Sequence, residues 1–140
     1  MADTTEGKHL MLEIVTPEQR VLTVEADEVR APGAEGGFGI RPGHTPLVAA
    51  LMPGELAYVT GGKLHRYAVG EGFAEVADDR VRILVEEAHR AEDLDPNATA
   101  DELAERTKKL AEMKQDDPYY EQERARVERA AARVTVATRR

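Results

Sequence analysis

The stretch Leu56-Ala-Tyr-Val-Thr-Gly-Gly-Lys-Leu-His-Arg-Tyr-Ala-Val69 places two strand-like runs on either side of Gly61-Gly62. A two-residue glycine link between such runs is typical of a β-hairpin, because the tight primed turn requires positive φ angles that glycine adopts without strain. The sequence therefore predicts a hairpin across this stretch.

Similar short runs fill the rest of the first half of the chain. In one of them Val81, Ile83 and Val85 alternate with other side chains, which is the period of a half-buried strand. Gly, Pro and Asp residues separate the runs, and many short strands at this spacing are typical of a sandwich or barrel. We expect strands at residues 10–15, 21–29, 38–40, 47–51, 56–60, 64–69, 73–77 and 81–85.

The second half of the chain has a different pattern. All 11 glycines and five of the seven prolines fall before residue 73, and the remainder is rich in charge and alanine. Thr99-Ala-Asp-Glu102 has the form of a capping box at a helix start. This helix should stop near Gln115, and Asp117 should cap a second helix with Pro118 at its first position. The predicted fold class is α+β, mainly β: an antiparallel β-sandwich at residues 1–91 and an antiparallel two-helix hairpin at residues 92–140.

Apolar stripes at helical spacing predict which faces of the two helices meet. The first stripe consists of Ala100, Leu103, Ala104, Thr107, Leu110 and Ala111, and the second of Tyr120, Val127, Ala131 and Val134. Such alanine-rich stripes bury little area, so we expect a hairpin of marginal stability on its own. A helical hairpin of marginal stability joined to a stably packed sandwich is a candidate for movement relative to it.

Composition excludes several classes of protein. The 140 residues include 27 Asp and Glu against 19 Lys and Arg, a net charge of −8, which is the wrong sign for a chain that binds nucleic acid over its whole surface. The chain has no cysteine and no serine, so disulfides and both of these nucleophiles are excluded. No apolar run approaches the ~20 residues of a membrane span. The polar start leads us to expect no secretory or transit signal.

Other candidates for chemistry are weak. The glycine cluster at residues 33–39 lacks the Gly-Lys-Ser/Thr ending of a phosphate loop and is followed by a strand-like run, so a tight turn is favoured. The acidic pairs are adjacent in sequence, which does not indicate an acid/base couple across a cleft. The four histidines lack the spacing of a helical metal site. Packed or surface imidazoles are favoured at His9 and His65, whereas His44, in a Pro-Gly-His-Thr-Pro turn, is the one histidine with a notable setting. We expect no catalytic residue, cofactor or metal.

The C-terminal end is basic. Six arginines follow residue 123 with Glu128 as the one acid among them, at positions 124, 126, 129, 133, 139 and 140. One interpretation is a solvated helix face with its cations near the helix C-terminus. The other is docking on an acidic protein surface, for which the planar guanidinium is well suited. The absence of interleaved aromatic residues argues against nucleic acid.

The stretch Val29-Arg-Ala-Pro-Gly-Ala-Glu-Gly-Gly-Phe-Gly-Ile-Arg-Pro-Gly-His-Thr-Pro-Leu47 resembles the signature of the epsilon subunit of F-type ATP synthases. The resemblance runs from about residue 8 to the end of the chain, and the arginine-rich final helix fits it in position and character. It continues through Pro53-Gly-Glu-Leu56, Tyr67-Ala-Val-Gly-Glu-Gly-Phe-Ala-Glu-Val76, Val81-Arg-Ile-Leu84 and Glu92-Asp-Leu-Asp95.

The resemblance implies a non-catalytic central-stalk subunit that couples proton translocation to ATP synthesis. In this family the sandwich binds the gamma subunit and rests on the c-ring. The helical hairpin either folds against the sandwich or extends along gamma into the alpha/beta ring, where it inhibits ATP hydrolysis. The implied location is peripheral, on the cytoplasmic face of a bacterial plasma membrane.

The resemblance also implies roles for particular residues. By position, the residues facing the c-ring are Glu35, Gly36, Arg41 and His44. The residues expected to dock on an acidic segment of the catalytic beta subunit are Arg124, Arg126, Arg129 and Arg133.

Two positions depart from the family pattern. Gly37 stands where some relatives carry a second acid at the c-ring contact. Some relatives bind ATP through an Ile/Leu-Asp-x-x-Arg-Ala motif, and Leu94-Asp-Pro-Asn-Ala98 has Ala in place of that Arg. Arg90 or Arg106 are possible substitutes, but we expect no tight ATP binding.

Two other functional classes stay open on the residues alone. A free-standing β-sandwich that binds a small ligand or carbohydrate predicts exposed aromatic residues on one face, and the chain has two Phe and four Tyr. An enzyme predicts a cluster of titratable groups, and the motifs provide none.

Overall fold

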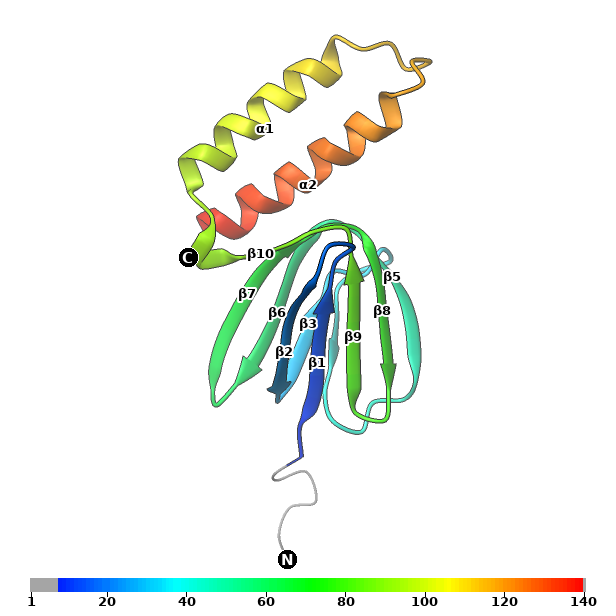
Figure 1. Ribbon diagram of the computed structural model, residues 1–140, viewed down its shortest axis with the longest axis vertical. Coiled ribbons are helices and arrows are strands. Elements are labelled where there is room, and N and C mark those ends of the chain that lie inside the picture. Colours follow the sequence, from blue (N-terminus) through cyan, green and yellow to red (C-terminus); the bar gives the residue numbers. More distant parts are fainter. Residues whose placement is uncertain (1–7, 140) are drawn as a thin grey trace, which may run out of the picture.

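The computed structural model describes residues 8–139, which form a β-sandwich carrying a helical hairpin at one end (Figure 1). The strands are β1 (Leu10–Val15), β2 (Arg20–Ala26), β3 (Glu28–Ala31), β4 (Phe38–Ile40), β5 (Leu47–Leu51), β6 (Gly54–Thr60), β7 (Lys63–Val69), β8 (Gly72–Ala77), β9 (Arg80–Val85) and β10 (Ala88–Arg90). A short 3-10 turn, η1 (Ala91–Asp93), leads into helices α1 (Pro96–Ala111) and α2 (Tyr120–Thr138). The predicted mainly-β class, with a sandwich followed by a two-helix hairpin, is confirmed.

The strands form two five-stranded sheets, ordered β2-β1-β9-β8-β5 and β10-β7-β6-β3-β4. Neighbouring strands pair antiparallel, as predicted. The exception is the pair of β1 and β9, which run parallel. A parallel pair needs a long connection, and here that connection contains most of the sandwich.

The tight turn between β6 and β7 reverses the chain with left-handed backbone angles. Gly61 and Gly62 have φ angles of 58° and 76°, and they join β6 to β7 with Thr60 paired to Lys63. These angles are those of a type I′ turn, so the predicted hairpin is confirmed.

The predicted strand at residues 21–29 is wrong, because the chain changes sheets within it. β2 belongs to one sheet and β3 to the other, and Asp27 lies at the corner between them. The Asp27 backbone N–H donates to the carbonyl of Val59 at 2.7 Å, and its carboxylate accepts a hydrogen bond from the backbone of Gly61 at 3.2 Å. These contacts fix the corner from a distant strand, so the local sequence does not reveal it. β10 and η1 were likewise not predicted.

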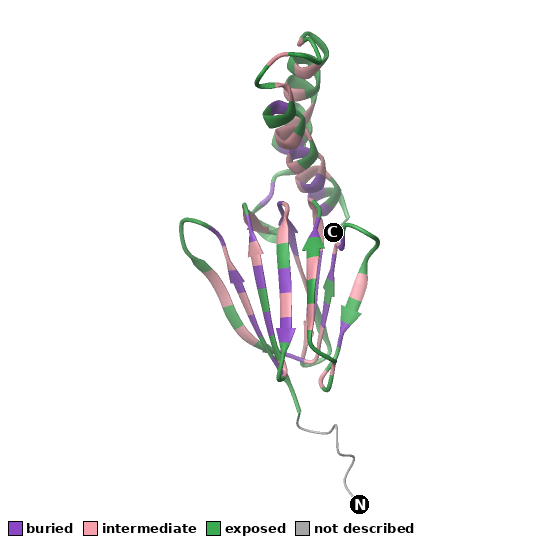
Figure 2. Cartoon of the chain, turned by 90° about the vertical axis from the view of Figure 1, so that its right-hand side faces the viewer, coloured by how far each residue is buried: buried purple, intermediate pink, exposed green. Residues whose placement is uncertain are grey.

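The core lies between the two sheets. Along β1, β8 and β9 buried positions alternate with more exposed ones, as the banding of strands in Figure 2 illustrates, which is the pattern of two sheets packed face to face. The largest fully buried side chains of the sandwich are Leu10, Leu12, Ile14, Ile40, Leu56, Ile83, Val29, Val69 and Val81. Burying each of them contributes about 1.5–3 kcal/mol, and the sandwich is therefore the stable part of the molecule.

The first helix starts earlier than predicted. Asp95 is its N-cap, with Oδ1 accepting from the Asn97 N–H at 3.0 Å and Pro96 in the first turn. The predicted capping box at Thr99 is wrong: the Thr99 hydroxyl donates back to the carbonyls of Asp95 and Pro96. An Asp directly before a Pro at the first helical position already provides the start signal. α1 also ends at Ala111, before the predicted stop.

The second helix begins at Tyr120, two residues after Pro118. The Asp117 carboxylate accepts from the Tyr119 N–H at 2.8 Å, so Asp117 caps the turn that precedes the helix rather than the helix itself.

The predicted apolar faces of the helices are wrong in part. In α1, Leu103 and Leu110 are half-buried as expected, but the small side chains of the stripe, Ala100, Ala104, Thr107 and Ala111, are exposed. In α2 the predicted residues Tyr120, Val127, Ala131 and Val134 are only half-buried, whereas the fully buried ones are Glu123, Ala130, Ala132, Val136 and Ala137. The helices turn polar side chains toward each other, which a search for apolar stripes does not find.

Candidate functional site

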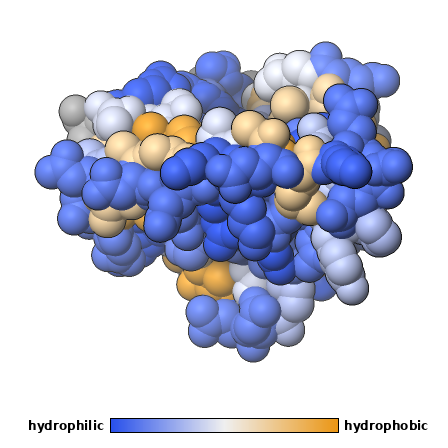
Figure 3. Space-filling view, turned by 90° about the horizontal axis from the view of Figure 1, so that it is seen from above, coloured by the Kyte–Doolittle hydropathy of each residue, from blue (hydrophilic) through white to orange (hydrophobic). Residues whose placement is uncertain are grey.

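The C-terminal half of α2 lies against the end of the sandwich (Figure 1). A small cluster of buried residues joins the two parts: Ala68 of β7, Ala91 and Leu94 before α1, and Val136 and Ala137 of α2. Three of these five side chains are alanines, so little apolar surface is buried. Seen from the hairpin end, the surface is largely hydrophilic, with small apolar areas (Figure 3). Polar contacts must therefore supply much of the attachment.

Two arginines of α2 reach carboxylates of the sandwich. Arg129 Nη1 donates to Glu71 Oε2 at 2.8 Å and its Nε lies 3.7 Å from Glu87 Oε1. Arg133 Nη1 donates to Glu87 Oε2, and its Nη2 donates to Glu102 Oε1 of α1 at 2.7 Å. The two arginine side chains are only 16% and 13% exposed. We call Glu71, Glu87, Arg129 and Arg133 the latch.

Glu87 is the centre of the latch. Burial alone would raise the pKa of its carboxyl group, but the hydrogen bond with His89 and the charge and hydrogen bond of Arg133 lower that pKa to about 2. Burial likewise opposes the charge of Arg133, yet the carboxylates of Glu102 and Glu87 raise the pKa of the guanidinium. Both partners are thus held in their charged forms.

Two further contacts secure the end of α2. Arg66 of β7 donates through Nη2 to the backbone carbonyl of Val136 at 2.9 Å and through Nε to Glu55 at 2.8 Å. Arg139 also approaches Glu55, at 3.5 Å. Arg140 lies outside the described residues. The hairpin is therefore held on the sandwich by ionic contacts along the last three turns of α2.

The other two arginines of the predicted beta-docking set have local partners. Arg124 donates to Glu121 and Glu128, both at 2.7 Å, and Arg126 donates to Glu123. All four predicted arginines thus have intramolecular partners in this conformation. Only Arg129 and Arg133 reach the sandwich.

Glu123 is buried between the two helices. Its carboxylate contacts Arg126 of its own helix and lies 3.5 Å from Lys109 and 3.9 Å from Arg106 of α1. Burial acts to raise the pKa of Glu123, but its hydrogen bond with Arg126 and the charge of Lys109 lower it. This carboxylate joins the outer halves of the two helices.

Three of the four residues expected to face the c-ring lie together. Glu35 and Gly36 form the turn between β3 and β4, where Gly36 has a φ of 124°. They and His44 line a groove of about 600 Å³ beside β4 and β5. Arg41 lines a different groove and contacts Glu28 at 3.2 Å. The structure therefore brings Glu35, Gly36 and His44 together and sets Arg41 apart from them.

An apolar row that the sequence motifs do not reveal lies on the outer face of the β2-β1-β9-β8-β5 sheet. The strand registers place Ala50, Phe73, Leu84 and Val15 side by side across four strands. Phe73 is 54% exposed, and Val48 nearby on β5 is 70% exposed. Phe73 in β8 and Leu84 in β9 are apolar residues at outward positions, next to the outward charged residues Glu75 and Arg82, which is the signal that could have revealed the row.

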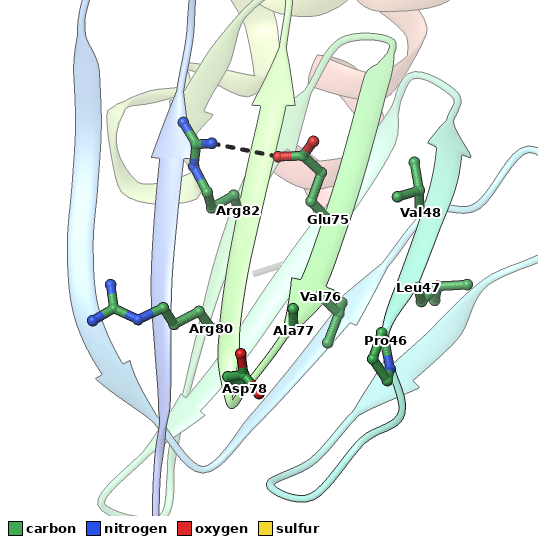
Figure 4. A pocket seen from close by; sticks show the side chains of 9 residues that line it. All are labelled: Pro46, Leu47, Val48, Glu75, Val76, Ala77, Asp78, Arg80 and Arg82. Atoms are coloured by element: carbon green, nitrogen blue, oxygen red, sulfur yellow. Dashed lines mark hydrogen bonds and ion pairs between the residues drawn. The ribbon is translucent and has the colours of Figure 1, made fainter.

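A shallow groove of about 580 Å³ adjoins this row. Figure 4 shows Val48 on one side of it, and the charged side chains of Glu75, Arg80 and Arg82 on the neighbouring strands. Arg82 donates to Glu75 at 3.4 Å. An exposed apolar row bordered by charged groups is typical of a surface that contacts another protein.

Comparisons with known proteins agree with this architecture. Residues 9–91 match the family described as ATP synthase, Delta/Epsilon chain, beta-sandwich domain. A protein of Anaeromyxobacter sp. (strain K) named ATP synthase epsilon chain is 50% identical over 130 residues, which are 93% of this chain and 98% of the relative. One of the same name from Myxococcus xanthus (strain DK1622) is 41% identical over 128 residues, 91% of this chain and 94% of the relative. The chain belongs to the ATP synthase epsilon family.

Solved structures show the same fold. A chain of the Euglena gracilis mitochondrial ATP synthase, in a cryo-EM structure of OSCP, F1 and the c-ring, matches with a TM-score of 0.74 and 25% identity over 94% of this chain and 85% of that chain. A chain of the Tetrahymena thermophila central stalk and c-ring matches with a TM-score of 0.58 and 13% identity over 94% of this chain and 98% of that chain. As an epsilon-family member, the chain is a non-catalytic subunit of the ATP synthase complex. This membership favours the subunit over the free-standing ligand-binding module.

The residues at the positions of the epsilon-family ATP motif have structural roles in this chain. Asp95 caps α1, Leu94 is buried, and Ala98 is exposed at the position of the motif arginine. Within residues 8–139, no group of three or more metal-ligating side chains could hold a metal ion. Over the same residues, no helix is long and apolar enough to cross a membrane.

Proposed function

We propose that this epsilon-family chain is a rotor subunit of a bacterial F-type ATP synthase. It helps to couple proton translocation to ATP synthesis, and its C-terminal hairpin inhibits ATP hydrolysis when it leaves the sandwich. The observation that carries the proposal is the difference between the packing of the sandwich and the attachment of the hairpin. A densely packed sandwich bears a hairpin that is held mainly by ion pairs and a few small side chains.

The sandwich serves as the rigid body that turns with its neighbours. The apolar row around Phe73 supports a contact with the gamma subunit, because an apolar surface of this kind gains stability when a partner covers it. The groove with Glu35, Gly36 and His44 supports a contact with polar loops of the c-ring. Arg41 lies outside this groove and serves that contact only at its margin. Through these partners the chain sits peripherally on the cytoplasmic face of the plasma membrane.

The hairpin serves as the regulatory arm. Its attachment consists of a few ion pairs and small buried side chains, and a binding partner can shift the balance between two positions that differ by about a few kcal/mol. In the extended position Arg124, Arg126, Arg129 and Arg133 dock on acidic residues of the catalytic beta subunit.

The test is ATP hydrolysis by the purified complex carrying the variant with these four arginines replaced by alanine. We expect this variant to relieve inhibition, and the inhibition by the unaltered chain to weaken as salt is added, because ionic contacts are screened. A control replaces Arg20, Arg30 and Lys63 of the sandwich, which are exposed cations outside both proposed contact surfaces. Unchanged hydrolysis with the α2 variant would refute docking by these arginines.

A further inference from the structure

We propose that Arg129 and Arg133 have two competing uses, so that Glu71 and Glu87 of the sandwich act as an internal competitor that limits inhibition by the arm. The inference rests on the proposed function, since it concerns when the arm is free to inhibit. The observation behind it is that the same guanidinium groups expected to dock on a partner are already bound by sandwich carboxylates.

The contacts show why the two uses exclude each other. Arg129 donates to Glu71 and approaches Glu87, and both carboxylates lie on the sandwich. With a side chain only 16% exposed, Arg129 offers a partner protein little access until α2 moves away. The arm must therefore break these pairs before the arginines can meet an acidic partner.

The two arginines differ in what they lose when the arm moves. Arg133 also binds Glu102, which lies on α1 and so travels with the hairpin. Among residues 8–139, the carboxylate partners of Arg129 are Glu71 and Glu87, which both belong to the sandwich and stay behind when the hairpin moves. Arg129 is therefore the group that depends more strongly on an external acid in the extended state.

The backbone of the sandwich is shaped to receive Arg129. A Cβ added to Gly70 would lie 3.2 Å from Arg129 Cδ and 3.3 Å from Glu86 Cβ and Glu87 Cγ. The aliphatic stem of Arg129 therefore packs where a larger residue would crowd it. Glycine at this position allows α2 to approach closely enough for both ion pairs.

The first experiment measures the position of the arm in the isolated full-length chain. The chain has no cysteine, so single-molecule energy transfer can use dyes on Lys63→Cys and Glu112→Cys, two exposed positions on the sandwich and the hairpin. We expect E71Q/E87Q to raise the ratio of freed to folded arm by about tenfold or more, because hydrogen bonds between charged groups are lost. The control E18Q/E86Q removes two exposed carboxylates near the same end of the sandwich and should leave the ratio unchanged.

The second experiment measures ATP hydrolysis by the complex with each variant. E71Q/E87Q should inhibit more strongly than the unaltered chain, since its arm is free while its arginines are intact. R129A/R133A should inhibit less, although its arm is also freed, because it has lost two docking groups. The two variants thus change the inhibition of ATP hydrolysis in opposite directions, which distinguishes competition from a simple loss of hairpin stability.

The outcomes separate the inference from the proposed function. The competition is overturned if E71Q/E87Q leaves the ratio of freed to folded arm unchanged. It is also overturned if, in a complex that the arm inhibits, this variant inhibits hydrolysis only as strongly as the unaltered chain, or less strongly. If removing the hairpin leaves hydrolysis unchanged, the inhibitory function fails, whereas the energy-transfer result still decides whether these carboxylates hold the arm.

Discussion

Arg66 of β7 donates from Nη2 to the backbone carbonyl oxygen of Val136 in α2, a contact of 2.9 Å between residues 70 positions apart. Carbonyl groups in the last turn of a helix lack intrahelical partners, and a cation there also suits the helix dipole. This single side chain therefore attaches the end of the arm to the sandwich and caps an otherwise unpaired group.

Replacing Arg66 with alanine should weaken arm docking by about 1–2 kcal/mol, because a charged hydrogen bond in a half-buried site is lost. Hydrogen exchange of the last two turns of α2 should accelerate about tenfold, with little change in the sandwich. The control is Arg20→Ala, which removes an exposed arginine elsewhere. Equal exchange rates in the two variants would show that Arg66 does not hold the arm.

Arm docking should weaken in acid through Glu87. The pKa of this carboxyl is lowered from 4.5 to about 2 in the folded state, so its contribution is present above pH ~4.5 and is lost as the pH falls toward 2. The full shift corresponds to about 3 kcal/mol, but the hydrogen bond with His89 stays on the sandwich when the arm leaves, so the share that acts on arm docking is about 1–2 kcal/mol. Energy transfer between the two domains from pH 5 to pH 2 should follow this loss. Glu87→Gln should flatten the profile, and an identical profile in that variant would contradict the assignment.

Asp95, and not Thr99, should control the start of α1. Asp95→Ala should destabilise the first turn by about 1 kcal/mol, as is typical for loss of an N-cap. Thr99→Ala should have a smaller effect, since its hydroxyl donates to carbonyls within the helix. Hydrogen exchange in the first two turns measures both, with the exposed Asp101→Ala as control. A larger effect at Thr99 would restore the capping box that the sequence predicted.

Phe73 should be central to binding gamma. Phe73→Asp places a charge in the apolar row at an exposed site, so we expect co-purification with gamma to fall at least tenfold while the sandwich keeps its unfolding temperature. Leu64→Asp on the other sheet is the matched control, because that side chain is also exposed, at 44%. Equal loss of gamma in both variants would remove the apolar row from the interface.

Local patterns predicted the parts of the fold that depend on local chemistry. The glycine turn at Gly61-Gly62 and the alternation from Val81 to Val85 identify strands, because turn angles and face burial are properties of neighbouring residues. The sheet change at Asp27 escaped prediction, since it is fixed by Val59 and Gly61 from a distant hairpin.

The arrangement of the hairpin depends on contacts that no local pattern records. Arg129 and Arg133 were identified as functional candidates, but Glu71 lies 58 residues from Arg129 and Glu87 lies 46 residues from Arg133. The orientation of α2 follows these ion pairs and the burial of Glu123, so an apolar stripe gave the wrong face. The apolar row likewise arises only when the strand registers align Val15, Leu84 and Phe73.

The most direct test of the central claim compares ATP hydrolysis by the complex containing the full-length chain with that containing a chain ending at Ala91. The account predicts that the truncated chain still co-purifies with gamma and that hydrolysis rises. Unchanged hydrolysis with a truncated chain that still binds gamma would contradict the inhibitory role of the arm. Failure of both chains to bind gamma would contradict the rotor assignment.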